Sequence, residues 1–368
     1  MNWLRAQADS RRTQGLHRTL RQRQPERIDI ASNDYLGLAR DPQVIEAGVD
    51  AMRAWGAGAT GSRLVSGHTP LHSELEATLA QLLKAEAVLT FSSGYLANLA
   101  AVTALCDRET LLLSDTYNHA SIVDACRLSR GRLRVYPNRD VAAVDNALQD
   151  NPHPRAVVVT DAVFSVDGDL APLADLATVC EAHNAILIVD EAHSVGVLGA
   201  GAGASAELSS PNLVRTFTLS KALGSQGGGV AATTEIVDHL VNTARSFIFD
   251  TGLAPGPVGS ALAAARRILT DPGLPEAALH STRTLAALAT DLGFEVAPFD
   301  AAVASIRIGA PEDAVRAQAI CADAGVDVGC FRPPSVPDGV ARLRMTGHAD
   351  LRNYSEIEKA LTMVKEQL

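Results

Sequence analysis

The chain has 368 residues, of which 47% are apolar and 20% are charged, and its formal net charge is −10 at pH 7. This length exceeds one average domain, and the apolar content supports a large buried core and excludes an intrinsically disordered chain. The negative charge argues against a nucleic-acid-binding surface, which is normally basic, but leaves room for local basic pockets that bind small anions.

The N-terminal part of the chain predicts three helices. Residues 4–24 predict a basic helix, with a solvated arm that packs on a neighbour as an equal alternative. Two amphipathic helices follow at 43–55 and 71–84, each with apolar side chains along one side.

From residue 87 onward, short apolar strands alternate with helices. Strands that are apolar throughout are typical of a mostly parallel sheet covered by helices on both faces. The helices are predicted to begin near Leu96 and Ile122 and to include 172–183. The predicted strands are 87–91, 111–113, 156–160, 185–189 and 214–219.

A Pro-Gly-Pro cluster at 255–257 predicts the end of this large α/β domain. A long Ala-rich helix and a smaller α+β pattern follow it. That pattern consists of strands at 303–308 and 341–346, a helix at 312–324 and a terminal helix from about 354. The predicted divisions are an N-terminal arm at 1–40, a large domain at 41–255 and a C-terminal α+β domain at 256–368.

The cysteines and the N-terminal segment indicate the cellular compartment in which we expect the protein. The five cysteines are an odd number without a C-x-x-C pair, so we expect no disulfide framework and a reducing cytoplasm. Residues 1–27 lack the apolar core of a secretory signal. No apolar run reaches the ~18 residues that a transmembrane helix needs. We therefore expect a cytoplasmic protein that does not cross a membrane.

Two motifs suggest functions that their surroundings do not support. Residues 56–61 match G-x-G-x-x-G, but a dinucleotide-binding fold needs this motif between a strand and a helix, and here it follows a predicted helix. Asp190-Glu-Ala-His193 spells the DEAH of some helicases, yet the chain has no G-x-x-x-x-G-K-[ST] phosphate loop.

Lys221 differs from the three other lysines of the chain. Lys84, Lys359 and Lys365 belong to amphipathic or terminal helices and resemble solvated side chains. Lys221 instead follows an apolar strand and precedes a Gly-rich turn, at the edge where parallel sheets bind ligands. Burial lowers the pKa of a lysine and makes it a Schiff-base nucleophile. A structural lysine that caps a loop is the alternative.

Asp190 ends the strand 185–189, and His193 follows three residues later. A carboxylate here could pair with a pyridinium nitrogen, whose protonation it would favour by about 1–3 pKa units. A metal site is less favoured, because no third ligand lies near in sequence, and we expect no metal. A structural Asp–His pair remains the alternative.

Other polar residues also follow predicted strands. Ser93, Gly94 and Tyr95 precede a helix and could bind a phosphate through backbone N–H groups, although helix N-capping is an equally ordinary use. Thr218 could add a hydroxyl. His119 could stack on an aromatic cofactor, and Ser165 follows a further strand. The convergence of five strand ends is more specific than any one motif.

These residues resemble those of the α-oxoamine synthases, which are fold-type-I pyridoxal-phosphate enzymes. The resemblance extends over almost the whole chain and implies a large, mostly parallel-sheet domain with a smaller C-terminal α+β domain. The segments that carry it are 32–38, 91–95, 118–121, 163–168, 189–193, 218–224, 247–255, 331–337 and 343–344.

The resemblance implies a role for each matching residue. Lys221 would hold pyridoxal phosphate as a Schiff base and deprotonate the amino acid. Asp190 would pair with the ring nitrogen, His119 would stack on the ring, and Ser165 and His193 would bond its phenolic oxygen. The other cofactor contacts would be Ser93, Gly94, Tyr95, Thr218 and, from the second subunit, Thr251.

The resemblance also implies the substrates. These would be L-alanine and a pimeloyl thioester, of coenzyme A or of a carrier protein, condensed with loss of CO2 in biotin biosynthesis by a homodimer. Asn33 and Arg344 would orient the amino-acid carboxylate, and His119 and Ser335 would contact substrate. Of His17 and Arg18, Arg18 is the preferred N-terminal contact. Alternatives are a synthase that uses glycine or serine and, less favoured, an aminotransferase. Ser194 stands where such synthases commonly have Gly, and Ser335 where they have Thr.

Overall fold

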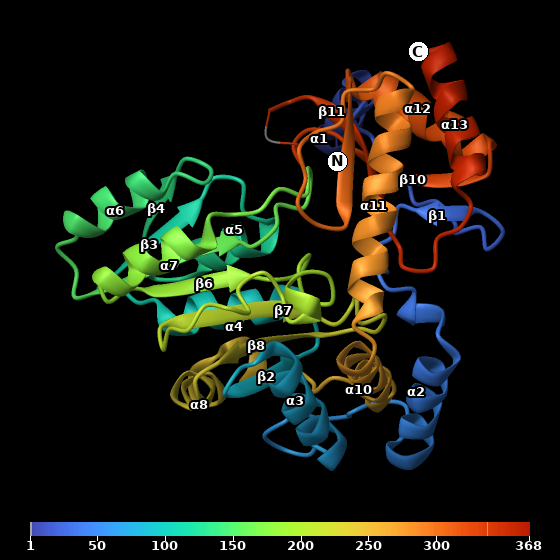
Figure 1. The fold of residues 1–368 in the computed structure, drawn as a ribbon. Helices are drawn as coiled ribbons and strands as arrows, with labels where there is room; N and C mark the ends of the chain where they lie inside the picture. Colours follow the sequence, from blue (N-terminus) through green and yellow to red (C-terminus); the bar gives the residue numbers. More distant parts are fainter. Residues whose placement is uncertain (1, 337) are drawn as a thin grey trace. The chain divides into compact units, whose positions relative to one another are not determined.

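The computed structural model describes residues 2–336 and 338–368, which form two compact units (Figure 1). The large unit contains Asn33–Ser165 and Asp169–Ala277, and the small unit contains the chain up to Ser32, Val166–Gly168 and Ala278–Leu368. The predicted boundaries at residues 40 and 255 cut the chain into continuous segments, whereas each unit combines segments that are distant in sequence. The domain boundaries at residues 40 and 255 therefore remain a prediction.

The large unit is built on one seven-stranded sheet of order β2-β8-β7-β6-β5-β3-β4. The pairs from β4 to β7 are parallel, which confirms the predicted mostly parallel sheet. Strand β8 is antiparallel to both β7 and β2, so β2 again points in the direction of the parallel strands. The strands are β2 (Ala87–Phe91), β3 (Thr110–Asp115), β4 (Arg132–Tyr136), β5 (Arg155–Asp161), β6 (Ile186–Asp190), β7 (Leu213–Thr218) and β8 (Gly228–Ala232).

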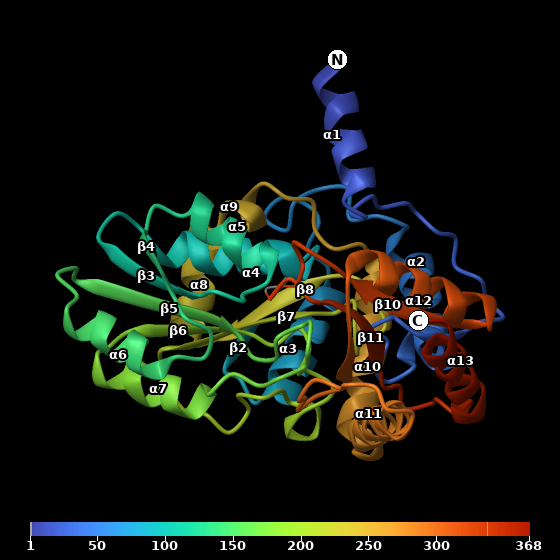
Figure 2. The same cartoon turned by 90° about the horizontal axis from the view of Figure 1, so that it is seen from above.

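Helices cover both faces of this sheet, as Figure 2 shows. One face packs against α4 (Gly94–Leu105), α5 (Ala120–Leu128), α8 (Thr234–Thr243) and α9 (Arg245–Ile248). The other face packs against α6 (Val141–Gln149) and α7 (Leu173–Ala182). Because both faces are buried, the central strands need apolar side chains in both directions, which explains their continuous apolar runs.

Three further helices of the large unit pack together. Helix α10 (Pro255–Thr270) lies against α2 (Pro42–Trp55) and α3 (Pro70–Leu83). The Pro-Gly-Pro cluster therefore begins a helix, since proline at the first helical position already has a helical φ. Short 3-10 turns occur at η1 (Leu38–Arg40) and η2 (Gly199–Gly201).

The small unit has a four-stranded sheet of order β1-β10-β11-β9. Strand β1 (Ile28–Ile30) pairs in parallel with β10 (Val326–Phe331), which is antiparallel to β11 (Ala341–Thr346), itself antiparallel to β9 (Val303–Gly309). This sheet forms the buried core of the small unit together with three helices. They are α11 (Gly273–Asp291) from Ala278 onward, α12 (Pro311–Asp323) and α13 (Tyr354–Gln367).

The N-terminal helix prediction was wrong in length. Helix α1 comprises Asn2–Thr13, and Gly15 at φ 65° ends the helical path that was expected to reach residue 24. Strands β1 and β10 of the small sheet and β4 and β8 of the large sheet were not predicted. In β4 every side chain before Tyr136 is exposed, and β8 begins with two glycines, so neither has an ordinary apolar strand pattern. Among the described helices, none combines the length and apolar character needed to cross a membrane.

His72 links the start of α3 to a distant loop and predicts a pH effect on stability. Its Nδ1 accepts from the Thr69 N–H at 3.3 Å, and its Nε2 lies 2.9 Å from the carbonyl oxygen of Leu253, to which it donates. Burial and the nearby Arg63 lower the pKa of His72 from 6.5 to about 4. The unfolded chain therefore takes up a proton at a higher pH, and stability is lost as pH falls from about 6.5 to 4.

A His72→Gln variant should lose less stability than the native chain over this pH range. Glutamine keeps a capping-box side chain but does not titrate. Urea unfolding at pH 7.5 and pH 5 measures the two free energies of unfolding. An equal loss in both proteins would show that His72 does not cause the pH dependence.

Candidate active site

Five polar or reactive side chains lie at one edge of the large sheet. Strands β2, β3, β5, β6 and β7 point in the same direction, so their carboxyl ends share that edge. The residues that end or follow these strands are Ser93, His119, Ser165, Asp190 and Lys221. The structure therefore has the convergence that the sequence predicted, at the edge where open α/β sheets bind ligands.

The Lys221 amine contacts a buried histidine. Its Nζ lies 2.7 Å from Nε2 of His193, and Nδ1 of His193 lies 2.6 Å from the hydroxyl of Tyr35. The same hydroxyl donates to Oδ1 of Asn33 at 3.1 Å. His193 is 6% exposed and Tyr35 is fully buried, so the packing holds both rings in place. The sequence analysis gave no role to Tyr35.

The Asp190 carboxylate is held by two donors. Asn98 Nδ2 donates to Oδ2 at 2.7 Å, and the Ala192 N–H donates to Oδ1 at 2.9 Å. Asn98 is itself fixed, because its Nδ2 also bonds Ser121 and its Oδ1 accepts from Thr216. The sequence analysis missed Asn98, although it is the polar residue among the buried positions of helix α4 and a buried amide needs partners.

A second carboxylate, Asp161, lies beside Asp190 and was also missed. The two residues are register partners at the ends of β5 and β6. Asp161 Oδ2 accepts from the His119 backbone N–H at 2.7 Å, which fixes the main chain that carries the His119 ring. Burial, followed by repulsion from Asp190, raises the pKa of Asp161 well above its usual range.

The end of β2 provides a close-packed turn at a helix N-terminus. Ser93 caps α4, where its Oγ accepts from the Leu96 N–H at 3.2 Å. A Cβ on Gly228 would lie 2.4 Å from Cα of Gly94, so the two backbones approach as only glycine allows. Thr218 Oγ1 lies 2.6 Å from Ser220 Oγ. Small residues, hydroxyls and a helix N-terminus together suit an anion such as phosphate.

The remaining predicted residues have varied surroundings. Tyr95 is exposed and donates to Asp124, and Thr251 is exposed in the segment before α10. In the small unit, Arg18 and Ser335 are exposed. Arg344, on β11 of the same unit, is 5% exposed and its guanidinium stacks 4.3 Å from the Phe331 ring centroid.

In the DEAH segment, Glu191 has a structural role in a buried network. Glu191 is fully buried and accepts from Nε of Arg215 at 3.1 Å, from the Ala204 N–H at 2.8 Å and from the Ser205 N–H at 3.0 Å. Ser194 donates its hydroxyl to the same carboxylate. The serine that departs from the family pattern is thus part of a buried network that holds the turn after Asp190.

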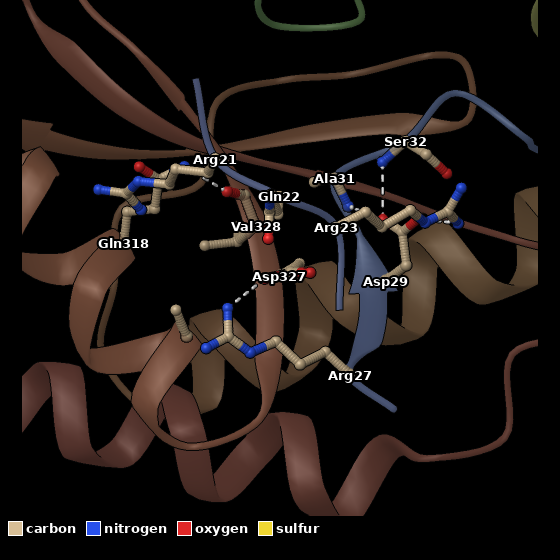
Figure 3. Close-up of a pocket in the computed structure, with 11 residues that line it drawn as sticks. Arg21, Gln22, Arg23, Arg27, Asp29, Ala31, Ser32, Gln318, Asp327 and Val328 are labelled. Carbon is tan, nitrogen blue, oxygen red and sulfur yellow. Dashed lines mark hydrogen bonds and ion pairs between the residues drawn. The ribbon is translucent and has the colours of Figure 1, made fainter. Parts of the chain in front are cut away.

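A separate pocket of about 350 Å³ lies within the small unit (Figure 3). Its charged side chains are partly compensated, since Arg23 pairs with Asp29 at 2.8 Å and Arg27 with Asp327 at 3.2 Å. None of the residues predicted to bind cofactor or substrate lines it.

Comparisons with known proteins agree with this geometry. Residues 25–361 match the model of the family "Aminotransferase class I and II". The 8-amino-7-oxononanoate synthase 1 of Mycobacterium tuberculosis H37Rv is 53% identical over 371 residues, covering 100% of this chain and 95% of the relative.

Solved structures give the same result. A serine palmitoyltransferase with pyridoxal phosphate superposes with a TM-score of 0.91 at 28% identity, covering 99% of this chain and 96% of that one. An 8-amino-7-oxononanoate synthase of Francisella tularensis gives a TM-score of 0.79 at 28% identity, with 94% and 98% covered. The chain therefore belongs to the class I and II aminotransferase family and, within it, to the pyridoxal-phosphate-dependent α-oxoamine synthases.

Proposed function

We propose that the chain condenses L-alanine with a pimeloyl thioester, releasing CO2 and free thiol, to form 8-amino-7-oxononanoate in biotin biosynthesis. The observation that carries this function is the 53% identity, over the whole chain, to synthases of that name. The arrangement of Lys221, Asp190 and His193 on one sheet edge is consistent with it.

The residues of the large unit fit pyridoxal phosphate. Lys221 would attach the cofactor, and the turn of Ser93 and Gly94 with Thr218 would hold its phosphate, with Tyr95 beside it. Asp190 would pair with the ring nitrogen. His119 would stack on the ring and contact substrate, while Ser165 and His193 would bond its phenolic oxygen. When bound, the cofactor delocalises the negative charge that develops on the amino-acid carbon.

The chain's own side chains supply the proton chemistry. The Lys221 amine would remove the Cα proton of alanine and return a proton to the product, which is worth roughly 10²–10⁴-fold in rate. Asp190, kept in place by Asn98, would keep the ring nitrogen protonated. Substrate binding is assigned to Asn33 and, in the small unit, to Arg18, Ser335 and Arg344.

We also propose that the chain works as a homodimer in the cytoplasm. Val65 is 84% exposed and Phe249 is 71% exposed, and their segments adjoin, because the Gly252 N–H bonds the Gly61 carbonyl at 2.9 Å. Exposed apolar side chains beside an active-site edge are typical of an interface. Thr251 in this region would reach the phosphate of a second copy. The five cysteines are free, which suits a reducing compartment.

Turnover with defined substrates tests the reaction. Purified protein supplied with pyridoxal phosphate should release CO2 and form 8-amino-7-oxononanoate from L-alanine and pimeloyl-CoA or a pimeloyl carrier protein. Glycine with acetyl-CoA and serine with palmitoyl-CoA should give little product. Brisk turnover with either of these pairs, and none with alanine, would assign another α-oxoamine synthase activity. Conversion to the pyridoxamine form without CO2 would identify an aminotransferase.

A further inference from the structure

Arg342, on β11, is a large buried side chain of the small unit. It is 2% exposed, and it forms ion pairs with the carboxylates of Asp167 and Asp338. Its Nε and Nη2 donate to Asp167 at 2.7 and 3.0 Å, and its Nη1 and Nη2 donate to Asp338 at 2.7 and 2.9 Å. The remaining N–H donates to the carbonyl oxygen of Val340. All five N–H groups of this guanidinium therefore have an acceptor.

Asp338 fixes the loop that carries Ser335. This Ser335 loop joins β10 to β11, and its described residues are 332–336 and 338–340. Asp338 also accepts from Nη2 of Arg307 at 2.9 Å, so two arginines hold one carboxylate. The bonds from Arg342 keep the pKa of Asp338 well below its usual range, and the carboxylate is therefore charged near neutral pH.

Asp167 fixes the segment that follows Ser165. Val166–Gly168 belong to the small unit, although the residues on either side of them belong to the large unit. A Cβ on Gly168 would lie 2.4 Å from the carbonyl oxygen of Val303, so the backbone of this segment packs directly on β9. Because the guanidinium binds Asp167 with two bonds, the residue two positions after Ser165 has both a main-chain and a side-chain anchor.

We propose that Arg342 is a positioning residue that sets one substrate contact and one cofactor contact together. One pair of its bonds holds the Ser335 loop through Asp338, and the other holds the segment after Ser165 through Asp167. A planar guanidinium fixes the direction of both carboxylates as well as their distance, which a lysine ammonium cannot do. The inference rests on the proposed function, because the roles of Ser335 and Ser165 belong to it.

Asp338→Asn tests the substrate contact. The amide keeps the size of the side chain but replaces one acceptor oxygen with a donor that faces an arginine N–H. The KM for pimeloyl-CoA should rise at least about 10-fold, since a displacement of about 1 Å can cost 10²-fold. The kcat and the KM for alanine should stay native. A general loss of stability would leave both KM values unchanged, and a native KM for pimeloyl-CoA would overturn the proposal.

Asp167→Asn tests the cofactor contact. If the phenolic oxygen loses its bond from Ser165, pyridoxal phosphate should bind about 10- to 100-fold more weakly, as expected for one lost hydrogen bond to a charged group. Absorbance titration of the cofactor-free chain measures this affinity. With saturating cofactor, the KM for pimeloyl-CoA should be native. An unchanged affinity for pyridoxal phosphate would contradict the proposed role of Arg342.

Amide hydrogen exchange of the cofactor-free chain gives a readout that needs no substrate. Arg342→Lys keeps the charge but cannot form both pairs of bonds, so exchange should become faster in the Ser335 loop and in Val166–Gly168. Asp338→Asn should accelerate only the first segment and Asp167→Asn only the second. These two single variants decide the test if Arg342→Lys folds poorly.

The matched control is Asp313→Asn, which breaks an exposed pair with Arg316 at 3.1 Å on α12 of the same unit and should behave as the native chain. Native exchange in both Asp167→Asn and Asp338→Asn would overturn the anchoring. Faster exchange with native KM and native cofactor affinity would make Arg342 purely structural and would overturn the positioning role. Turnover of a different acyl thioester would refute the proposed function alone, because the exchange prediction does not depend on it.

Discussion

Lys221→Ala is expected to abolish covalent retention of pyridoxal phosphate and to lower condensation by at least about 10²–10⁴-fold. The amine is both the group that attaches the cofactor and the base that removes the substrate proton. Asp190 with its Asn98 support, and the turn of Ser93 and Gly94, remain in the variant, so cofactor should still bind reversibly. Borohydride reduction, denaturation and mass spectrometry distinguish covalent from reversible binding.

The matched control for this variant is Lys84→Ala. Lys84 is exposed, pairs with the exposed Glu207 at 2.7 Å and does not follow a strand of the large sheet. This control should keep the cofactor mass and native turnover. In the native protein, borohydride-reduced cofactor attached to a lysine other than Lys221 would overturn the assignment. Covalently attached cofactor in Lys221→Ala would do the same.

The parallel part of the large sheet was predictable because burial on both faces leaves a continuous apolar run in each strand. The run at 87–91 matches β2 in full, whereas β4 was missed because it alternates arginines with exposed leucine and valine. The basic helix was extended too far since arginine and glutamine favour helices, and the effect of Gly15 was not weighed. Sequence periodicity also could not join Val166–Gly168 to the C-terminal segments of the small unit.

The residues at strand ends were predictable for a related reason. Parallel strands deliver their following residues to one edge, so five strand ends could be combined without knowing the strand order. Supporting residues gave no such signal. Asn98 contacts Asp190 from α4, and Tyr35 contacts His193 across 158 positions of sequence. These pairings depend on how helices and loops cover the sheet, which local patterns do not determine.

Glu191→Gln is expected to lower the free energy of unfolding by about 3–5 kcal/mol, the usual cost of leaving one charge of a buried pair without its partner. Glu191 is fully buried, and the side chain of its partner Arg215 is 6% exposed. The neutral amide also places an N–H donor where the Ala204 and Ser205 N–H groups now donate to the carboxylate. Both effects act on the turn that follows Asp190.

Urea unfolding of Glu191→Gln, beside Glu207→Gln as the control, measures this loss. The exposed pair of Glu207 with Lys84 should contribute little to the free energy of unfolding, because solvent screens both charges. In Glu191→Gln/Arg215→Met the unbalanced charge is removed, so the double variant should lose less than the sum of the two single losses. A Glu191→Gln loss as small as that of Glu207→Gln, or additive losses in the double variant, would contradict the buried-pair argument. Glu191 takes no part in the proposed chemistry, but its buried contacts hold the turn that carries Asp190 and His193.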